Sequence, residues 1–267
     1  PCVGLFSCNI AIINNNMQVI VDGLLTNFQD EGKGEILLCL HGWGADNTSF
    51  ESISKHFSKK YRVIRIDLPG FGKSQIPPET WHVEDYSNFI KKFLEKIGVK
   101  DIHAIVAHSF GGRVAIKLIS KQILLPDKVI FMGAAGIKPD IGTKKLIYKT
   151  VAKTGRTLTR LPGLKKLQTT LRKKLYAKAG ADDYLQAGPM RKIFLTTIDE
   201  DLTNEIANIT KPTLLIWGEQ DDQTPVQDAY VFHEKIIGSQ LITISNAGHF
   251  VHTEKPNEVE KYMEKFL

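Results

Sequence analysis

The sequence predicts an α/β fold, with a mostly parallel central sheet and helices on both of its faces. Strand-like and helix-like segments alternate along most of the 267 residues. The expected strands are short, continuous apolar runs, as strands covered on both faces require. A hydrophobic content of 42% in a chain of this length allows one large core. We therefore expect one α/β domain with an insertion, rather than two independent domains.

The expected sheet starts with a hairpin and continues with six apolar strands. Residues 17–21 and 24–29 are expected to form an antiparallel hairpin joined at Asp22-Gly23, a pair typical of tight hairpin turns. The later strands are expected at residues 36–40, 62–66, 102–107, 129–132, 213–217 and 241–244.

Helices are expected between these strands. Thr48 with Glu51 three residues later forms a capping-box pattern, which predicts a helix through Phe57. Apolar residues from Tyr86 to Ile97 recur at helical spacing and predict a second, amphipathic helix.

The stretch of residues 137–208 interrupts the alternation with helix-like segments and no clear strand. The core is therefore expected to comprise residues 1–136 and 209–267, with a helical insertion at 137–208 after the sixth strand. Between residues 138 and 178, thirteen Lys and Arg residues face one acid, Asp140, whereas the whole chain carries a net charge of +6. Such a basic segment can attract an acidic protein, an anionic substrate or an anionic lipid surface. A solvated helix face that keeps the protein soluble is the plainer alternative.

A short motif at residues 107–111, Ala-His-Ser-Phe-Gly, lies between an expected strand and an expected helix. A sharp strand-to-helix turn needs small residues two positions before and two positions after the turning residue. Ala107 and Gly111 meet that need around Ser109, although Ala stands where Gly is usual. The motif predicts that Ser109 is held as a nucleophile above the sheet.

An acid and a histidine follow the serine in the chain order that accompanies a serine at a strand-to-helix turn. Asp221 follows the expected strand 213–217, and His249 follows the strand 241–244. Ahead of the serine, the His-Gly-Trp-Gly motif at residues 41–44 ends another apolar run and can direct backbone N–H groups to the same place.

On these motifs the chain resembles the α/β-hydrolase family from about Met17 to its C-terminus. The resemblance implies that Ser109 is the nucleophile, His249 the general base and then acid, and Asp221 the carboxylate that orients the imidazole. Asp221 is preferred to Asp222 because the family places its acid three residues after the Gly of a Trp-Gly pair.

The resemblance also implies an oxyanion hole, formed by the backbone N–H groups of Trp43 and Phe110. In this family the insertion at 137–208 is a cap over the active site. Candidate residues of a substrate pocket are His41, Phe71, His108 and Tyr184. For the two histidines, an orienting or packing role is the alternative.

The loop at residues 67–74 contains two glycines but lacks the Gly-Lys-Ser/Thr ending of a phosphate loop. It resembles a structural turn that lines the site in this family. His249 and His252 are three residues apart without a third ligand nearby, so no metal is expected. No cofactor is expected either, and neither a zinc-finger spacing nor an aromatic-basic motif indicates nucleic acid.

The implied function is a serine hydrolase that cleaves a carboxylic ester, lactone or thioester through an acyl-enzyme. Serine at position 109, rather than Asp, argues against dehalogenation and epoxide hydrolysis. Hydrolysis of carbon-carbon bonds or of N-terminal proline peptides on the same triad stays an alternative, as does a ligand-binding or scaffold role without turnover. The motifs are similar to those of small microbial carboxylesterases, one of which acts on an acidic carrier protein, so such a carrier is a possible partner of the basic cap.

Three cysteines argue against a disulfide framework, and Cys39 is expected to be a small core residue. No apolar run approaches the roughly 20 residues of a transmembrane helix. No Lys or Arg precedes Lys33, so the charged start of a secretory signal is missing. A cytoplasmic location is therefore predicted. Residues 1–16 are either foreign to a protein that starts at Met17 or form an extra edge strand.

Overall fold

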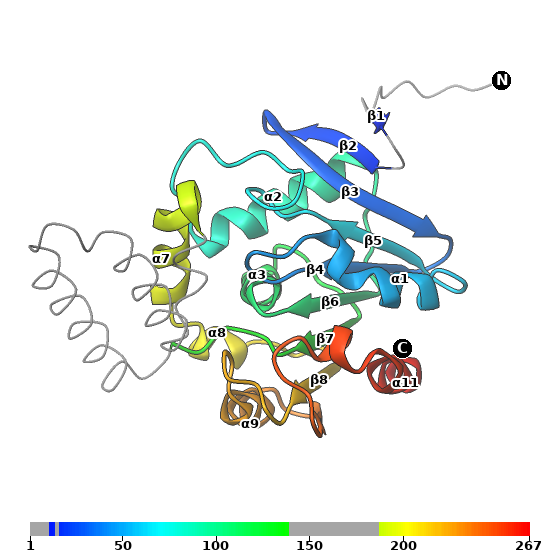
Figure 1. Ribbon diagram of the computed structural model, residues 1–267, viewed down its shortest axis with the longest axis vertical. Helices are drawn as coiled ribbons and strands as arrows, with labels where there is room; N and C mark the ends of the chain where they lie inside the picture. The colour runs from blue at the N-terminus through cyan, green and yellow to red at the C-terminus, as the bar shows by residue number, and fades with distance from the viewer. Residues whose placement is uncertain (1–10, 14–15, 139–186) are drawn as a thin grey trace, which may run out of the picture.

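Nine strands form one sheet in the computed structural model, which describes residues 11–13, 16–138 and 187–267 (Figure 1). The strand order is β1-β2-β3-β5-β4-β6-β7-β8-β9, and all neighbours from β5 through β4 to β9 run parallel. The strands are β1 (Ala11–Ile13), β2 (Asn16–Val21), β3 (Leu24–Gly32), β4 (Ile36–Leu40), β5 (Arg62–Ile66), β6 (Ala104–His108), β7 (Lys128–Met132), β8 (Thr213–Gly218) and β9 (Gln240–Ile244). This is the predicted mostly parallel α/β sheet.

The antiparallel edge of the sheet confirms the predicted hairpin. Asp22 and Gly23 have φ angles of 48° and 79°, the positive values that a two-residue turn between twisted strands needs. Strand β3 then pairs antiparallel with β5, Phe28 opposite Ile66. Beyond the hairpin, β1 pairs with β2, so residues 11–13 form an edge strand.

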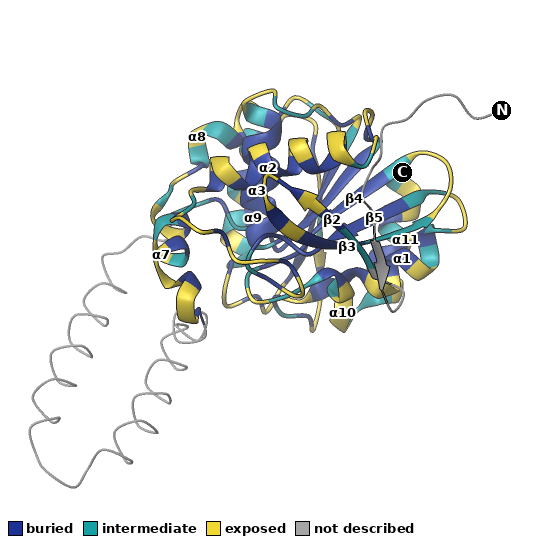
Figure 2. Cartoon of the chain, turned by 90° about the horizontal axis from the view of Figure 1, so that it is seen from above, coloured by how far each residue is buried: buried dark blue, intermediate teal, exposed yellow. Residues whose placement is uncertain are grey.

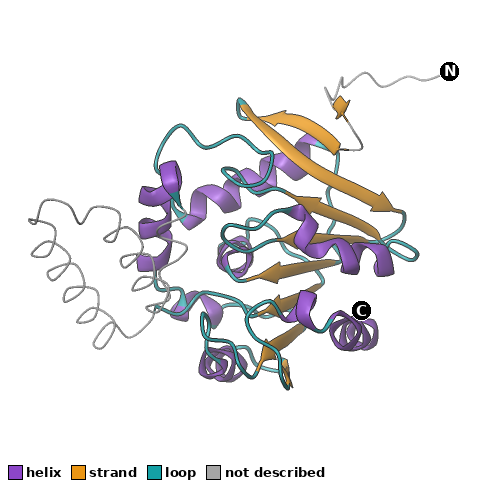
Figure 3. Ribbon diagram, in the orientation of Figure 1, coloured by secondary structure: helices purple, strands orange, loops and turns teal. Residues whose placement is uncertain are grey.

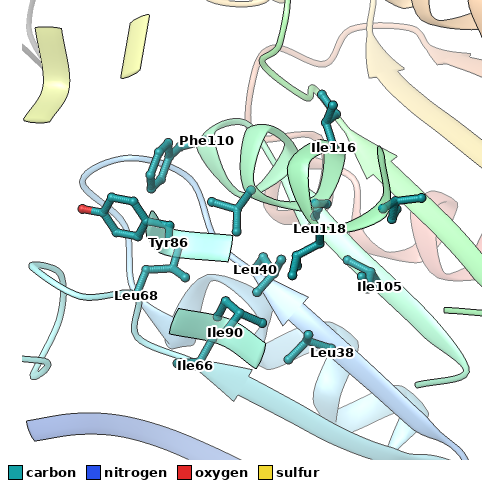
Figure 4. Packing of buried hydrophobic residues seen from close by; sticks show 14 of the residues in the cluster. Leu38, Leu40, Ile66, Leu68, Tyr86, Ile90, Ile105, Phe110, Ile116 and Leu118 are labelled. Atoms are coloured by element: carbon teal, nitrogen blue, oxygen red, sulfur yellow. The ribbon is translucent and has the colours of Figure 1, made fainter. Parts of the chain in front are cut away.

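Side chains alternate between two cores, one on each face of the sheet. On β4, Leu38 and Leu40 belong to the core beneath the helices α2 (Val83–Lys96), α3 (Phe110–Ser120) and α9 (Val226–Lys235) (Figure 4). Leu37 and Cys39 belong to the opposite core, beneath α1 (Glu51–Phe57) and α11 (Pro256–Phe266). Figure 2 shows the buried strands between these two helical layers, and Figure 3 distinguishes the strands from the helices by colour. Cys39 is buried and unpaired, and burial raises the pKa of its thiol to about 12.

The start of the helix after β4 differs from the prediction. A 3₁₀ turn, η1 (Asn47–Phe50), comes first, and α1 begins only at Glu51. The cap is Asp46, whose Oδ1 accepts hydrogen bonds from the Thr48 N–H at 2.8 Å and the Thr48 hydroxyl at 2.5 Å. The predicted capping role of Thr48 was wrong because an acceptor two residues earlier satisfies the first free N–H groups.

The chain returns to the core through three short helices, η2 (Gly188–Met190), α7 (Arg191–Asp199) and α8 (Thr203–Ile206). Two buried cations of α3 hold this segment. Arg113 donates to the Glu200 carbonyl at 2.6 Å, and the Lys117 ammonium lies 2.7 Å from Glu200 and 2.9 Å from Glu205. Burial lowers the pKa of Lys117, but these hydrogen bonds outweigh it and leave that pKa raised. The helix that follows Ser109 thus also anchors the returning segment.

Most of the predicted cap lies outside the described residues, which resume at residue 187. The part of this range from residue 188 to residue 206 contains η2, α7 and α8. The division into core and cap stays a prediction, as does the basic surface between residues 138 and 178. Among the helices that the structure describes, none combines the length and apolarity needed to cross a membrane.

Candidate active site

Ser109 occupies a strained turn between β6 and α3. Its φ of 48° and ψ of −113° are unusual for a residue with a side chain and persist only where the surroundings fix them. The Ser109 carbonyl accepts hydrogen bonds from the N–H groups of Gly112 at 2.9 Å and Ala135 at 3.0 Å. A Cβ on Gly111 would lie 2.0 Å from the Leu40 carbonyl oxygen, so only glycine fits there. The structure therefore has the strand-turn-helix that the motif at 107–111 predicts.

Ala107 replaces the glycine that usually opens this motif. Its methyl group is fully buried in the core beneath α2 and α3. The fold therefore accommodates the additional methyl group of Ala107 within this core.

Asp221 and His249 form a buried hydrogen-bonded pair at the carboxyl edge of the sheet. His249 Nδ1 lies 2.9 Å from Asp221 Oδ2 and 3.1 Å from Oδ1. The Asp221 side chain has no exposed area, and that of His249 is 4% exposed. Asp222 is exposed to solvent. This geometry favours Asp221 as the carboxylate that orients the imidazole.

Thr224 completes the surroundings of the Asp221 carboxylate. Its N–H and hydroxyl donate to the carboxylate at 2.9 Å each, and the N–H of Gln223 adds a third bond at 2.9 Å. The same hydroxyl lies 3.0 Å from the Gly133 carbonyl. Thr224 was not predicted from the sequence, although an Asp side chain often accepts a hydrogen bond from the backbone N–H two residues later, as Asp221 does from Gln223.

Ser109 and His249 are neighbours in the fold without a direct hydrogen bond. The ring of His108, the residue before Ser109, lies 4.7 Å from the His249 ring between centroids. Within the described residues, the Ser109 hydroxyl makes no hydrogen bond to His249. Such bonds often tighten only when substrate binds, so the arrangement is compatible with a nucleophile and its base.

Two backbone N–H groups flank the serine. Phe110 is the first residue of α3, where helix N–H groups have no partner within the helix. Trp43 lies in the loop after β4, next to Gly42. Within the described residues, neither of these two N–H groups donates a hydrogen bond. Both are therefore available to a negative oxygen, and their role as an oxyanion hole stays a prediction.

His41 links the loop after β4 to the loop after β5. Its Nδ1–H donates to the Gly42 carbonyl at 2.7 Å, and its Nε2 accepts from the Leu68 N–H at 2.9 Å. Burial lowers the pKa of His41, against the hydrogen bond to Gly42 and the nearby carboxylates Asp67 and Asp46. A neutral imidazole thus fixes the loop that carries Trp43.

The loop at residues 67–74 is held by the buried Asp67 carboxylate. It accepts from the Asn27 amide at 2.8 Å, from the backbone and amide of Asn47 at 2.7 and 2.6 Å, and from the Lys73 N–H at 2.9 Å. A Cβ on Gly72, whose φ is 53°, would lie 2.3 Å from this carboxylate. These contacts are those of a structural turn.

An aromatic cluster surrounds Trp43. Between ring centroids, Trp43 lies 4.8 Å from Phe71, 5.3 Å from Phe110 and 5.0 Å from Phe194. Phe194 comes from α7, which lies beyond the carboxyl ends of the parallel strands in Figure 1. Phe194 was not among the pocket residues predicted from the sequence.

The structure describes three of the four predicted pocket residues. His41, Phe71 and His108 are all buried, and Tyr184 lies outside the described residues. Contact with a substrate stays a prediction for all four. In the described ranges, no group of three or more His, Cys, Asp or Glu residues is placed to hold a metal ion.

A strand-turn-helix serine beside a buried Asp-His pair, on a mostly parallel sheet, is the arrangement of one large class of hydrolases. A family model described as the alpha/beta hydrolase fold matches residues 35–256. The chain belongs to this family and is a hydrolase of it.

Particular relatives are similar over most of the chain. A hydrolase of Bacillus subtilis, YugF, is 27% identical, with 92% of this chain and 96% of YugF covered. Among solved structures, an esterase from Exiguobacterium antarcticum has a TM-score of 0.72 at 23% identity, covering 93% of this chain and 98% of the esterase. A meta-cleavage product hydrolase from Pseudomonas fluorescens has a TM-score of 0.70 at 23% identity, with coverages of 93% and 96%. At these identities the two structures support the fold alone.

Proposed function

We propose that the chain is a serine hydrolase that cleaves carboxylic esters through an acyl-enzyme, with Ser109, His249 and Asp221 as its triad. The observation that carries the proposal is the buried Asp221–His249 pair at the same sheet edge as the strained Ser109 turn. A nucleophile, a base and an orienting acid, each on a different loop, have no evident purely structural purpose.

The proposed reaction has two acyl-transfer steps. His249 Nε2 accepts the Ser109 proton while Oγ forms a bond to the substrate carbonyl carbon, whose oxygen becomes negative. The N–H groups of Trp43 and Phe110 stabilise that oxygen. His249 then returns the proton to the departing alcohol as the ester bond breaks. Water repeats the attack on the acyl-enzyme, which releases the acid and restores Ser109.

The substrate is proposed to be a small molecule. Neither the described residues nor the relatives support an acidic carrier protein. Esters are the first choice, since a solved structure of similar fold is an esterase. Carbon-carbon bond hydrolysis is the second candidate, because another structure of similar fold is a meta-cleavage product hydrolase.

The proposal is tested with a substrate panel and a covalent probe. The panel contains p-nitrophenyl esters of rising acyl length, a γ-lactone, a proline anilide and a vinylogous diketone of the meta-cleavage type. We expect ester turnover, and stoichiometric labelling by a fluorophosphonate that mass spectrometry assigns to Ser109. Turnover of the diketone alone would favour the second candidate. No labelling and no turnover on any substrate would reject the proposal.

Phe194 is expected to limit the size of the acyl group. Its ring packs against Trp43, whose N–H is a proposed oxyanion donor, so Phe194→Ala opens space beside the reacting carbonyl. We expect the ratio of kcat/KM for octanoyl over acetyl esters to rise about tenfold, as one or two methylenes in an apolar pocket can produce. The matched control is Leu195→Ala on the same helix, since Leu195 is 46% exposed. An unchanged ratio in Phe194→Ala would show that Phe194 does not limit the length of the acyl group.

A further inference from the structure

His108 connects three loops of the candidate active site. It is the last residue of β6, directly before Ser109, and only 1% of its surface is exposed. Its ring contacts the loop that carries His249 and the loop that carries Trp43. A side chain in this place can set the distances between nucleophile, base and oxyanion donors.

The contact with the base is a hydrogen bond to its backbone. His108 Nε2 lies 3.0 Å from the His249 carbonyl oxygen, across 141 residues of sequence. Because a carbonyl only accepts, Nε2 carries the proton. The His249 carbonyl belongs to the same residue whose ring binds Asp221, so this bond fixes the backbone from which the base projects.

The contact with the oxyanion loop is a close approach to Gly42. A Cβ on Gly42 would lie 2.8 Å from His108 Nδ1 and 3.1 Å from Ser109 Cβ. Only glycine allows the residue before Trp43 to come this near to the turn. The His108 ring therefore also limits how closely the oxyanion loop can approach Ser109.

The second ring nitrogen of His108, Nδ1, gains nothing from its buried position. Nδ1 of His108 is buried, and within the described residues it has no hydrogen-bond partner. A buried acceptor without a partner destabilises a fold, whereas a phenyl ring would fill the same space without that cost. The bond from Nε2–H to His249 is the one polar contact of this ring among the described residues, so it is the feature that an imidazole adds.

The surroundings keep His108 neutral. Burial holds the pKa of His108 well below its ordinary value, and the neighbouring His252 and His249 add to the shift, with a smaller contribution from His41. The hydrogen bond to the His249 carbonyl acts in the opposite direction and does not reverse it. One nitrogen thus keeps its proton for donation across the ordinary working range of a hydrolase.

We propose that His108 is a positioning residue, which holds the His249 backbone at a fixed distance from Ser109 through its Nε2–H bond. The inference rests on the proposed serine-hydrolase function and adds a residue outside its triad. This role requires no contact of His108 with the substrate or with the reacting atoms. The proposed effect on the rate passes through the geometry of His249, beside the steric limit that the ring sets on the oxyanion loop.

Two substitutions distinguish the contribution of the Nε2–H hydrogen bond from that of the imidazole ring as a space-filling group. His108→Phe keeps a ring and loses the donor, whereas His108→Gln loses the ring and carries an amide N–H close to the position of Nε2. We expect His108→Phe to lower kcat about 100-fold with KM within about threefold, since a misplacement near 1 Å has effects of that size. The rate of fluorophosphonate labelling falls in parallel. His108→Gln is expected to recover at least tenfold over His108→Phe.

The matched control is His103→Phe. His103 is a largely buried imidazole just before the other end of β6, stacked on Tyr61, and its substitution is expected to leave kcat unchanged. If His108→Phe does not fold, His108→Asn replaces it, because the shorter amide cannot reach the His249 carbonyl and the same loss is expected.

Two outcomes overturn the inference. They are a wild-type kcat in His108→Phe, with or without a rise in KM, and a His108→Gln variant that is no more active than His108→Phe. A wild-type protein that neither turns over esters nor reacts with the fluorophosphonate rejects the proposed function itself. Ester turnover with an unaffected His108→Phe rejects only the role of His108.

Discussion

Ser109→Ala is expected to lower kcat for ester hydrolysis by about six orders of magnitude, as removal of the nucleophile does in a well-studied serine hydrolase. The effect is large because no acyl-enzyme forms without Oγ. The remaining groups can then assist only a direct attack of water on the ester. The fold should survive, since the turn at residue 109 is fixed by its backbone bonds to Gly112 and Ala135.

The control for this variant is Ser120→Ala, at the other end of α3. The Ser120 hydroxyl is buried and has no hydrogen-bond partner among the described residues, so its loss should leave kcat unchanged. Thermal unfolding of both variants checks that the fold is intact. More than a few per cent of wild-type activity in Ser109→Ala would refute the nucleophile assignment.

The second large expected effect is a loss of folding stability at acidic pH, and it arises from His252. This residue is 1% exposed, and its ring lies 4.5 Å from His108 and 5.0 Å from Phe50, on which it stacks. Both ring nitrogens are without a partner in the described part of the chain. Burial, with a contribution from His249, lowers the pKa of His252 from its ordinary value of 6.5 to about 3.

The sign of the effect follows from proton uptake. Between pH 6.5 and about 3 the unfolded chain binds a proton at residue 252 and the folded chain does not, so falling pH favours unfolding. The stabilisation is complete above the unfolded pKa and is lost as pH falls towards the folded one. By pH 4, about 3 kcal/mol of the free energy of unfolding is lost through this group.

Urea unfolding of the wild type and His252→Phe at pH 7 and pH 4 measures this contribution. The variant should lose about 3 kcal/mol less than the wild type between the two pH values. Any cost of fitting a phenyl ring cancels in that difference. His82→Phe, at an exposed histidine, should keep the wild-type dependence. Equal losses in wild type and His252→Phe would contradict a neutral His252.

The sequence predicted the sheet well because its strands carry local signals. The apolar runs at 36–40 and 62–66 coincide with β4 and β5, and each is bounded by polar or glycine-rich segments. The turn at Asp22-Gly23 has a local cause as well, since those residues tolerate positive φ. Where two local signals competed, as Asp46 and Thr48 did for a helix cap, sequence pattern alone chose wrongly.

The candidate site was predictable only where chemistry and chain order identify a residue. Ser109, Asp221 and His249 each follow a strand, and parallel strands bring their carboxyl ends to one edge. The contact of Phe194 with Trp43 has no such signal, because it depends on how the chain returns from the insertion. The bond from His108 to the His249 carbonyl is equally non-local, since it joins a side chain to a backbone atom that every residue possesses.

The proposed catalytic residues come from two stretches of chain, which pair along the seam between β7 and β8. The nucleophile and both oxyanion donors precede residue 138, whereas the acid and base follow residue 187. The two stretches meet in the sheet where Met132 pairs with Ile216, and the Gly133 N–H donates to the Ile216 carbonyl at 3.1 Å. Two polypeptides made separately on either side of the seam would each hold a fragment of the triad, so restored turnover on mixing them would be a direct assay of their complementation.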